Sequence, residues 1–173
     1  MKYVAFLRAI NVGGHAIIKM ADLKKMFESA GLENVQTYIQ SGNVIFESDR
    51  EVESLTKQIE HQLEKAAEYK IELFVRTMRE VQAIAQKSPY KPEGDETVFV
   101  SFLNEKPAKK SQQAMLAFRS EADNFAFKGR ELYSLRRDRT KSIFSGNLVE
   151  KTIKMPTTTR NLTTILKLAE KYK

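Results

Sequence analysis

Residues that could bind an anion or move a proton gather at a glycine pair near the N-terminus. Gly13 and Gly14 follow an apolar run, and His15 comes directly after them. Exposed backbone N–H groups at such a turn can hold an anion, and a histidine can act as a general acid or base near neutral pH. The pair can equally be a plain connection between a strand and a helix, because glycine pairs are common in turns. The spacing matches neither the G-x-x-x-x-G-K-S/T phosphate loop nor the G-x-G-x-x-G fingerprint. The sequence therefore leaves open whether the glycine pair is an anion site or a plain turn.

No complete catalytic or metal-binding constellation accompanies this turn. His15 and His61 are the only histidines, and neither belongs to an H-E-x-x-H zinc motif or accompanies a G-x-S-x-G serine motif. The chain has no cysteine, which excludes thiolate metal ligands and cysteine nucleophiles. We therefore predict no metal and no cofactor. The sequence leaves open whether the protein is an enzyme, and His15 is the candidate proton shuttle if it is one.

A second candidate for anion binding lies in the segment TTTRN near the C-terminus. An arginine set among hydroxyl groups at a helix N-terminus is a good anion clamp, which makes Arg160 the candidate ligand. Thr159 or Asn161 can cap the helix that we expect to follow, over residues 161–172. The alternative role of Arg160 is to pair with a carboxylate across a subdomain interface.

The net charge of +7 is confined to the second half of the chain. Residues 1–90 hold 12 Lys and Arg against 12 Asp and Glu, whereas residues 91–173 hold 17 against 10. Four cations lie close together in the second half: Arg136, Arg137, Arg139 and Lys141. Such a cluster can bind nucleic acid through its phosphates, or it can be a solvated face that only aids solubility.

The hydrophobic pattern predicts an α+β protein made of two ferredoxin-like subdomains packed together. Strand, helix, hairpin, helix and strand follow one another in residues 1–90, which is the β-α-β-β-α-β order. Prolines and a glycine in residues 88–96, where the charge balance also changes, indicate a boundary near residue 90. Residues 91–173 begin again with strand, helix, hairpin and helix, so we expect a second, basic subdomain. The halves share an element order but little residue identity.

Two local patterns carry structural expectations. Thr77 and Glu80 have the spacing of a capping box at a helix start. Phe125 and Phe127 flank an alanine as in an RNA-recognition strand, but the residues around them depart from that signature. Strand alternation sends both rings to one face, which is more often core than a platform for stacking bases.

Neither a membrane segment nor a signal peptide is expected. No apolar stretch approaches the roughly 20 residues that a membrane helix needs. The N-terminal segment MKYVAFLRAI contains Arg8 and has no small-residue cleavage site, so we interpret it as a strand. We predict a cytoplasmic protein without a membrane partner, and the sequence does not fix its oligomeric state.

Three blocks of the sequence resemble a known bacterial family. They are RAINVGG with KMADL behind it, TYIQSGNVIF, and PTTTRNLTTILKLAE. These blocks are similar to the family catalogued as domain of unknown function 1697, with Ala9 in place of the glycine expected between the arginine and the isoleucine. The resemblance covers essentially the whole chain and implies two α+β subdomains. It implies no established activity.

The resemblance also groups polar residues that could converge on one cleft. In chain order, those that we predict to bind the ligand are Arg8, Asn11, Gly13, Gly14, Lys19, Ser41, Asn43, Arg160 and Asn161, and His15 joins them as the candidate proton shuttle. The cations would supply charge, the short polar side chains hydrogen bonds, and the glycines close backbone approach. We predict that this cleft binds a small anionic or phosphorylated ligand. The alternatives are a nucleic-acid-binding module in the basic half, and an interaction domain without ligand in which these groups only cap helices and connect the subdomains.

Overall fold

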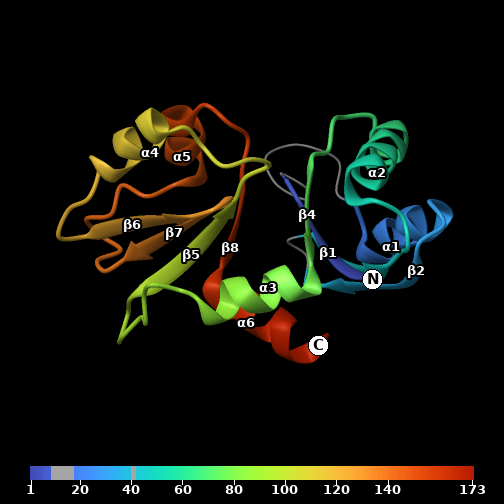
Figure 1. Cartoon of the computed structure of the whole chain (residues 1–173), viewed down its shortest axis with the longest axis horizontal. Coiled ribbons are helices and arrows are strands. Elements are labelled where there is room, and N and C mark those ends of the chain that lie inside the picture. The colour runs from blue at the N-terminus through green and yellow to red at the C-terminus, as the bar shows by residue number, and fades with distance from the viewer. Residues whose placement is uncertain (9–17, 40–41) are drawn as a thin grey trace. The chain divides into compact units, whose positions relative to one another are not determined.

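The chain forms two compact units, each with its own sheet (Figure 1). The computed structural model describes residues 1–8, 18–39 and 42–173. Met1–Val81 and Leu168–Lys173 make up the first unit, and Gln82–Lys167 make up the second. Across the described residues, no helix is both long enough and apolar enough to cross a membrane.

The limits of the units fall inside two helices, α3 (Met78–Gln86) and α6 (Leu162–Lys171). They differ from the predicted division into residues 1–90 and 91–173, because helix α3 follows the strand before it without a break. The last residues of the chain also belong to the first unit. The domain boundary near residue 90 stays a prediction.

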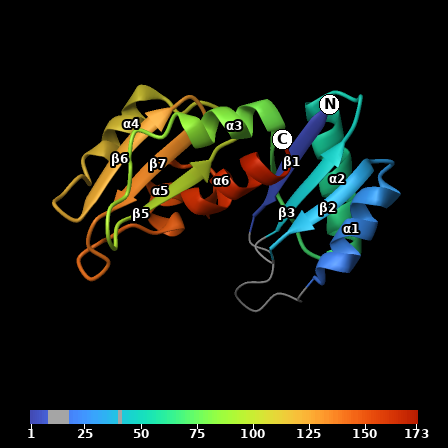
Figure 2. The same cartoon turned by 90° about the horizontal axis from the view of Figure 1, so that it is seen from below.

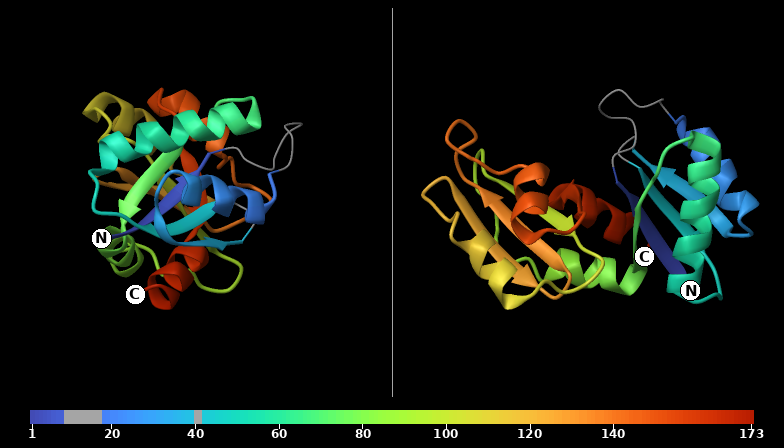
Figure 3. Two further views of the ribbon diagram at one scale, coloured as in Figure 1. Left: turned by 90° about the vertical axis from the view of Figure 1, so that its right-hand side faces the viewer. Right: turned by 90° about the horizontal axis from the view of Figure 1, so that it is seen from above.

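The first unit has the ferredoxin-like order of elements. These are β1 (Lys2–Leu7), α1 (Met20–Ser29), β2 (Glu33–Tyr38), β3 (Asn43–Glu47), α2 (Val52–Ala67) and β4 (Leu73–Thr77). The strands form one antiparallel sheet in the order β2-β3-β1-β4. Helices α1 and α2 cover the same face of this sheet (Figure 3). Alternate residues of β1, such as Ala5 and Leu7, share a core with Phe27 and Ile59 from the two helices.

The C-terminal residues pack on the first unit. The Tyr172 ring meets the Tyr38 ring edge to face, with 6.2 Å between centroids, and Lys171 Nζ lies within 5.4 Å of both centroids. Lys2 Nζ donates a hydrogen bond to the Tyr172 carbonyl at 3.0 Å. These contacts explain why the end of α6 belongs with the N-terminal sheet.

The second unit repeats this topology. Its elements are β5 (Thr97–Phe102), α4 (Lys109–Leu116), β6 (Asp123–Lys128), β7 (Glu131–Arg136), α5 (Gly146–Ile153) and β8 (Thr158–Asn161). The antiparallel strand order β6-β7-β5-β8 is the same ferredoxin-like order, and Figure 2 shows β6, β7 and β5 side by side. Helices α4 and α5 share a core with Phe125 and Leu132. The predicted fold class is confirmed.

The segment TTRN was expected at a helix start, and that expectation is wrong for three of its residues. Thr158, Thr159 and Arg160 belong to the edge strand β8, which pairs with β5, and the helix begins only at Leu162. A strand of four polar residues lacks the apolar alternation by which a sequence reveals a strand. Asn161 is the cap, because its Oδ1 accepts a hydrogen bond from the Thr163 N–H at 2.9 Å.

The two units repeat one strand register as well as one topology. The Leu7 N–H donates to the Gly42 carbonyl at 2.9 Å, and the Leu103 N–H donates to the Arg130 carbonyl at 2.9 Å. In each unit this bond stands at the end of the pairing between the first strand and the third, and its position in the pairing is the same in both units. The register therefore aligns YVAFLR, which begins in β1, with FVSFLN, which begins in β5, and three of the six residues are identical.

The fourth strands carry a second sign of the repeat. Arg76 in β4 lies opposite Val4, and Arg160 in β8 lies opposite Val100. Both arginines are buried, and in each the Nη1 group donates to the carbonyl of the preceding residue, at 3.1 Å and 3.0 Å. Each arginine also lies two residues before the helix that follows its strand.

The capping box predicted at the start of α3 is confirmed. The Thr77 N–H donates to Glu80 Oε2 at 2.7 Å, and the Glu80 N–H donates to Thr77 Oγ1 at 3.1 Å. The two groups thereby satisfy two donors at the helix start.

Two fully buried serines on one face of the second sheet differ in their hydrogen bonding. Ser101 Oγ lies 2.8 Å from Thr159 Oγ1, whereas Ser134 Oγ has no hydrogen-bond partner among the described residues. A buried hydroxyl without a partner costs free energy, so we expect Ser134→Ala to raise the free energy of unfolding by about 1 kcal/mol. Ser101→Ala, which deprives Thr159 of its partner, is expected to lower it by about 1 kcal/mol. Urea unfolding measures both variants, and a similar loss in both would contradict the distinction.

Candidate functional site

The first two sequence motifs meet at one end of the first sheet, where β1 finishes and β3 and β4 begin. The Leu7 N–H donates to the Gly42 carbonyl and the Arg8 N–H to the Glu72 carbonyl, each at 2.9 Å. We call this the motif end and define it by Arg8, Gly42, Asn43 and Glu72. The proximity that the sequence predicts for the end of the first strand and the hairpin is present in these residues.

The hairpin at the motif end is held in a costly backbone conformation. Ile39 has a φ of 52°, which is rare for a β-branched residue, and its side chain is 49% exposed. Asn43 is fully buried, and its Nδ2 group donates to the Tyr38 carbonyl at 2.9 Å. Asn43 therefore supports the turn from inside the sheet. Its predicted contact with a ligand stays a prediction.

Two predicted cations lie around the motif end. Arg8 Nη1 forms an ion pair with Glu72 Oε1 at 3.1 Å, and the Arg8 side chain is 32% exposed. Lys19 is exposed and stands at the N-cap position of α1. Within the described residues, no side chain makes a capping hydrogen bond to this helix.

The carboxyl group of Glu60, whose pKa is raised, lies near Glu72 of the Arg8–Glu72 ion pair. Glu60 on α2 accepts a hydrogen bond from the Leu73 N–H at 2.9 Å. Burial raises the pKa of Glu60 above its usual 4.5, and the nearby charge of Glu72 raises it further. The Leu73 hydrogen bond and the Lys70 charge act in the opposite direction but do not cancel the rise.

The remaining residues of the first two motifs lie outside the described residues: Asn11, Gly13, Gly14, His15 and Ser41. Their predicted roles stay predictions.

The last motif belongs to the second unit. Arg160 is buried there, its Nη1 donates to Thr158 Oγ1 at 2.7 Å, and burial lowers its pKa to about 10. Asn161 is exposed and caps α6. The predicted cleft of three motifs joins residues of both units, and it also stays a prediction.

The connections at the motif end are longer than their counterparts in the second unit. Between β1 and α1 there are 12 residues, against 6 between β5 and α4. The β2–β3 turn has 4 residues against 2, and the α2–β4 connection has 5 against 4. Since both units hold the same strand order, and the same register at this end of the sheet, the shorter connections are sufficient for the fold. The additional residues at the motif end are therefore not explained by the fold.

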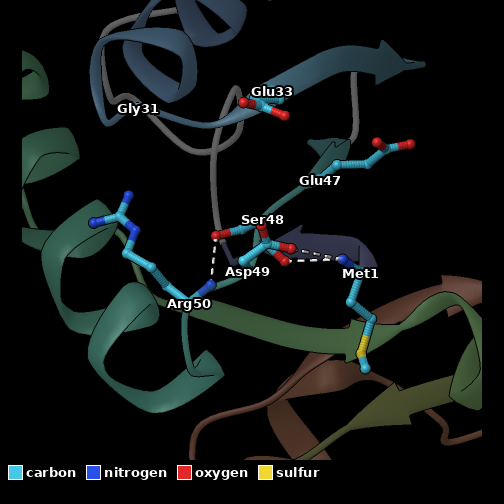
Figure 4. Close-up of a pocket in the computed structure, with 7 residues that line it drawn as sticks. All are labelled: Met1, Gly31, Glu33, Glu47, Ser48, Asp49 and Arg50. Carbon is cyan, nitrogen blue, oxygen red and sulfur yellow. Dashed lines mark hydrogen bonds and ion pairs between the residues drawn. The ribbon is translucent and has the colours of Figure 1, made fainter.

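A polar pocket lies at the opposite end of the first sheet (Figure 4). Its volume is about 240 Å³, and it is lined by Met1, Gly31, Glu33, Glu47, Ser48, Asp49 and Arg50. Its polar groups hold the surrounding elements together. Arg50 donates to the Ala30 carbonyl at the end of α1 and to Gln58 on α2, both at 2.6 Å, and Glu47 accepts from Asn34 at 2.9 Å. Hydrogen bonds that connect neighbouring elements thus account for the Arg50 and Glu47 side chains in this pocket.

No group of three or more His, Asp or Glu side chains suited to hold a metal ion occurs in residues 1–8, 18–39 and 42–173. His61 is exposed on α2.

The four cations of the basic cluster differ in their surroundings. The Arg136 guanidinium lies 4.9 Å from the centre of the Phe99 ring, and its Nε is buried without a hydrogen-bond partner in the described part of the chain. Arg137 lies 3.9 Å from a Glu96 oxygen. Arg139 and Lys141 are exposed. Arg136 is thus engaged with an aromatic ring, which its position in the basic run does not reveal.

The aromatic pair of β6 belongs to the core of the second unit. Phe125 is fully buried in the cluster beneath α4 and α5, and Phe127 packs against that cluster. This agrees with the interpretation of these rings as core rather than as a base-stacking platform.

Sequence reasoning missed two buried charged residues, Arg76 and Asp123. Alignment of the two halves would have found Arg76, because VRTM in the first half corresponds to TRNL around Arg160. Asp123 carries no such signal. Its carboxylate accepts hydrogen bonds from Ser142 Oγ at 2.6 Å and from the Ile143 N–H at 2.9 Å, and these residues lie far along the chain.

Comparison with known proteins supports the fold and the family. A family model described as "Protein of unknown function (DUF1697)" matches residues 1–133, which include the first two sequence motifs. The conserved bacterial protein SP0830 from Streptococcus pneumoniae has a similar structure, with a TM-score of 0.73 and 23% sequence identity over 99% of this chain and 98% of that chain. At this identity the similarity concerns the fold alone. No curated protein matches the chain.

Because the pKa of Glu60 is raised, we expect the free energy of unfolding to depend on pH. The folded state holds the Glu60 proton more tightly than the unfolded chain, so stability falls as the pH rises above 4.5 through the raised pKa. Glu60→Gln keeps an oxygen for the Leu73 N–H and removes the charge. We expect its melting temperature to exceed that of the wild type at neutral pH and to equal it below pH 4.5. Glu64→Gln, at an exposed position of the same helix, is the control, and equal effects of both variants would contradict the assignment.

Proposed function

The chain belongs to the DUF1697 family of proteins of unknown function, and we propose that it binds a small anionic ligand, such as a phosphorylated molecule, at the motif end of its first unit. One observation carries this proposal. Two connections that are longer than the fold requires lie side by side, because one leaves β1 and the other enters its neighbour β3, and the Leu7 N–H donates to the Gly42 carbonyl between them. Loops that a rigid sheet positions and that the fold does not need are a common location of binding sites.

The cations at this end favour an anion. The Arg8 guanidinium is paired with the Glu72 carboxylate through its Nη1 group. A guanidinium carries five N–H donors in a planar fork that matches carboxylate and phosphate oxygens. Lys19 adds a second positive charge at the start of α1. A cation at a helix N-terminus is unfavourable next to the positive end of the helix dipole, and a bound anion would offset this cost.

The strained turn supports the same location. The second unit uses a glycine, Gly129 with a φ of 59°, directly after its second strand, where the first unit has Ile39 with a φ of 52°. A costly backbone conformation that a glycine would relieve is more frequent at binding sites than elsewhere. The exposed Ile39 side chain would offer an apolar contact beside the charged groups.

The other motif residues complete the proposal. Asn11, Gly13, Gly14 and Ser41 lie within the two long connections and would contribute hydrogen bonds and close backbone approach. His15 would be the proton shuttle if the ligand reacts. The proposal does not depend on Arg160 and Asn161.

A thermal-shift screen tests the proposal, with inorganic phosphate, pyrophosphate and AMP as probes. A ligand at a hundred times its dissociation constant stabilises by about 2.7 kcal/mol, which is several degrees for a chain of this size. We expect a shift with at least one probe, and we expect Arg8→Gln to abolish it. Arg79→Gln removes an exposed arginine of the same unit and is expected to keep the shift.

Two results would contradict this function. One is the absence of a shift with every probe. The other is an equal loss of the shift in Arg8→Gln and Arg79→Gln, which would indicate general attraction of anions rather than a site at Arg8.

A further inference from the structure

The second unit has longer connections of its own at the other end of its sheet, one of 6 residues between α4 and β6 against 3 in the first unit, and a longer one after β7. Between β7 and α5 there are 9 residues, 137–145, whereas the first unit uses 4 residues between β3 and α2. We call residues 137–145 the basic loop. The first and third strands pair in the same register in both units, so the fold needs only the shorter connection. The additional length carries Arg137, Arg139 and Lys141.

The basic loop is fixed to the unit at both of its ends. The Arg137 N–H donates to the Ala122 carbonyl at 2.7 Å. Near the other end, the fully buried Asp123 carboxylate accepts the hydrogen bonds from Ser142 and Ile143. The Phe144 ring stacks on Phe99 with 4.9 Å between centroids. The loop therefore has a defined conformation.

The tip of the loop presents its cations to solvent. Asp138 Oδ1 accepts from the Thr140 N–H at 2.9 Å and from the Thr140 hydroxyl at 2.7 Å, and these bonds hold the pKa of Asp138 below its usual value. Arg139 and Lys141 flank Thr140 and are exposed. Both hydrogen bonds lie within the turn, so the Asp138 side chain stabilises the tip of the loop that carries the two cations.

Arg119 extends the charged surface beyond the loop. Its guanidinium donates twice to the Phe125 carbonyl on the edge strand β6, at 2.8 Å and 3.2 Å. The Arg137 N–H donates to the Ala122 carbonyl just before β6, so Arg119 and the start of the basic loop both bond to the backbone around that strand. Arg119, Arg137, Arg139 and Lys141 form what we call the basic-loop surface.

We propose that the basic-loop surface binds nucleic acid through its phosphates, independently of the anion site in the first unit. Three of the four cations are arginines, whose planar forks suit phosphate oxygens better than a lysine does. The charge of the whole unit supports this partner. The second unit holds 16 Lys and Arg against 9 Asp and Glu, a net charge of +7, whereas the first unit holds 13 against 13. A field of one sign attracts a polyanion to that unit alone.

The aromatic rings of this region do not read bases. Phe99 lies between the Phe144 ring and the Arg136 guanidinium, and Phe125 is in the core. Contacts with phosphates alone carry no sequence information, so we expect binding without sequence preference that weakens steeply with salt.

Fluorescence anisotropy of the full chain with a labelled single-stranded oligonucleotide of about 16 nucleotides tests the proposal. The variant is the pair Arg139→Gln and Lys141→Gln. Each lost phosphate contact lowers the slope of log affinity against log salt by about 0.7 on a single strand, so we expect a decrease of about 1.4 and weaker binding at about 50 mM salt. The control is Lys109→Gln with Lys110→Gln, which removes two exposed cations of the same unit from α4. We expect the control to keep most of the affinity and the slope.

Three outcomes would overturn the proposal. The first is no binding by the wild type at about 50 mM salt, and the second is an equal loss in the control and in the variant. The third is displacement of the oligonucleotide by poly-glutamate at equal charge concentration, which would identify an acidic protein surface as the better partner. The result for the anion site does not change any of these outcomes, because Arg8→Gln leaves the second unit intact.

Discussion

The pairing of the first strand with the third determines where everything else in each unit lies. The first strand is central in its sheet and bonds to the third on one side and to the fourth on the other. In both units a backbone hydrogen bond of 2.9 Å closes the first pairing just after or at the strand end, from Leu7 to Gly42 and from Leu103 to Arg130. A shift by one residue would turn every side chain of the strand to the other face, so burial on both faces fixes this register. Once it is fixed, the chain must leave β1 beside the turn that enters β3.

The repeated register makes each unit a reference for the other. What both units share is sufficient for the fold, and this includes the buried arginines Arg76 and Arg160 at corresponding positions. What only one unit has calls for another explanation. The first unit is electrically neutral and has its longer connections at the motif end, whereas the second carries the net charge of the chain and has its longer connections at the opposite end. The two proposals follow from these differences, and each concerns one unit by itself.

The sequence predicted the elements better than it predicted the environment of individual charges. Apolar periodicity identified most helices and strands, since burial of one face imposes it. It missed β8, because four polar residues on an edge strand show no alternation. The sequence nominated Arg160 as an anion ligand or as one side of an ion pair at an interface, and Arg136 as part of a basic cluster. One is buried in β8, and the other packs on Phe99, because neighbours from distant segments decide whether an arginine is covered. The similarity of YVAFLR and FVSFLN was present in the sequence, but only the strand register singles it out from chance.

We infer that the additional residues at the motif end serve a ligand and not the fold. A variant in which the Gly-Arg pair of residues 129 and 130 replaces residues 39–42 tests this when its melting temperature is measured with and without pyrophosphate. We expect a melting temperature no lower than that of the wild type, because the two-residue turn joins the same register at this end and the strain at Ile39 is removed. We also expect loss of the pyrophosphate shift. A melting temperature many degrees lower would show that the fold requires the longer turn, and a retained shift would show that the ligand binds elsewhere.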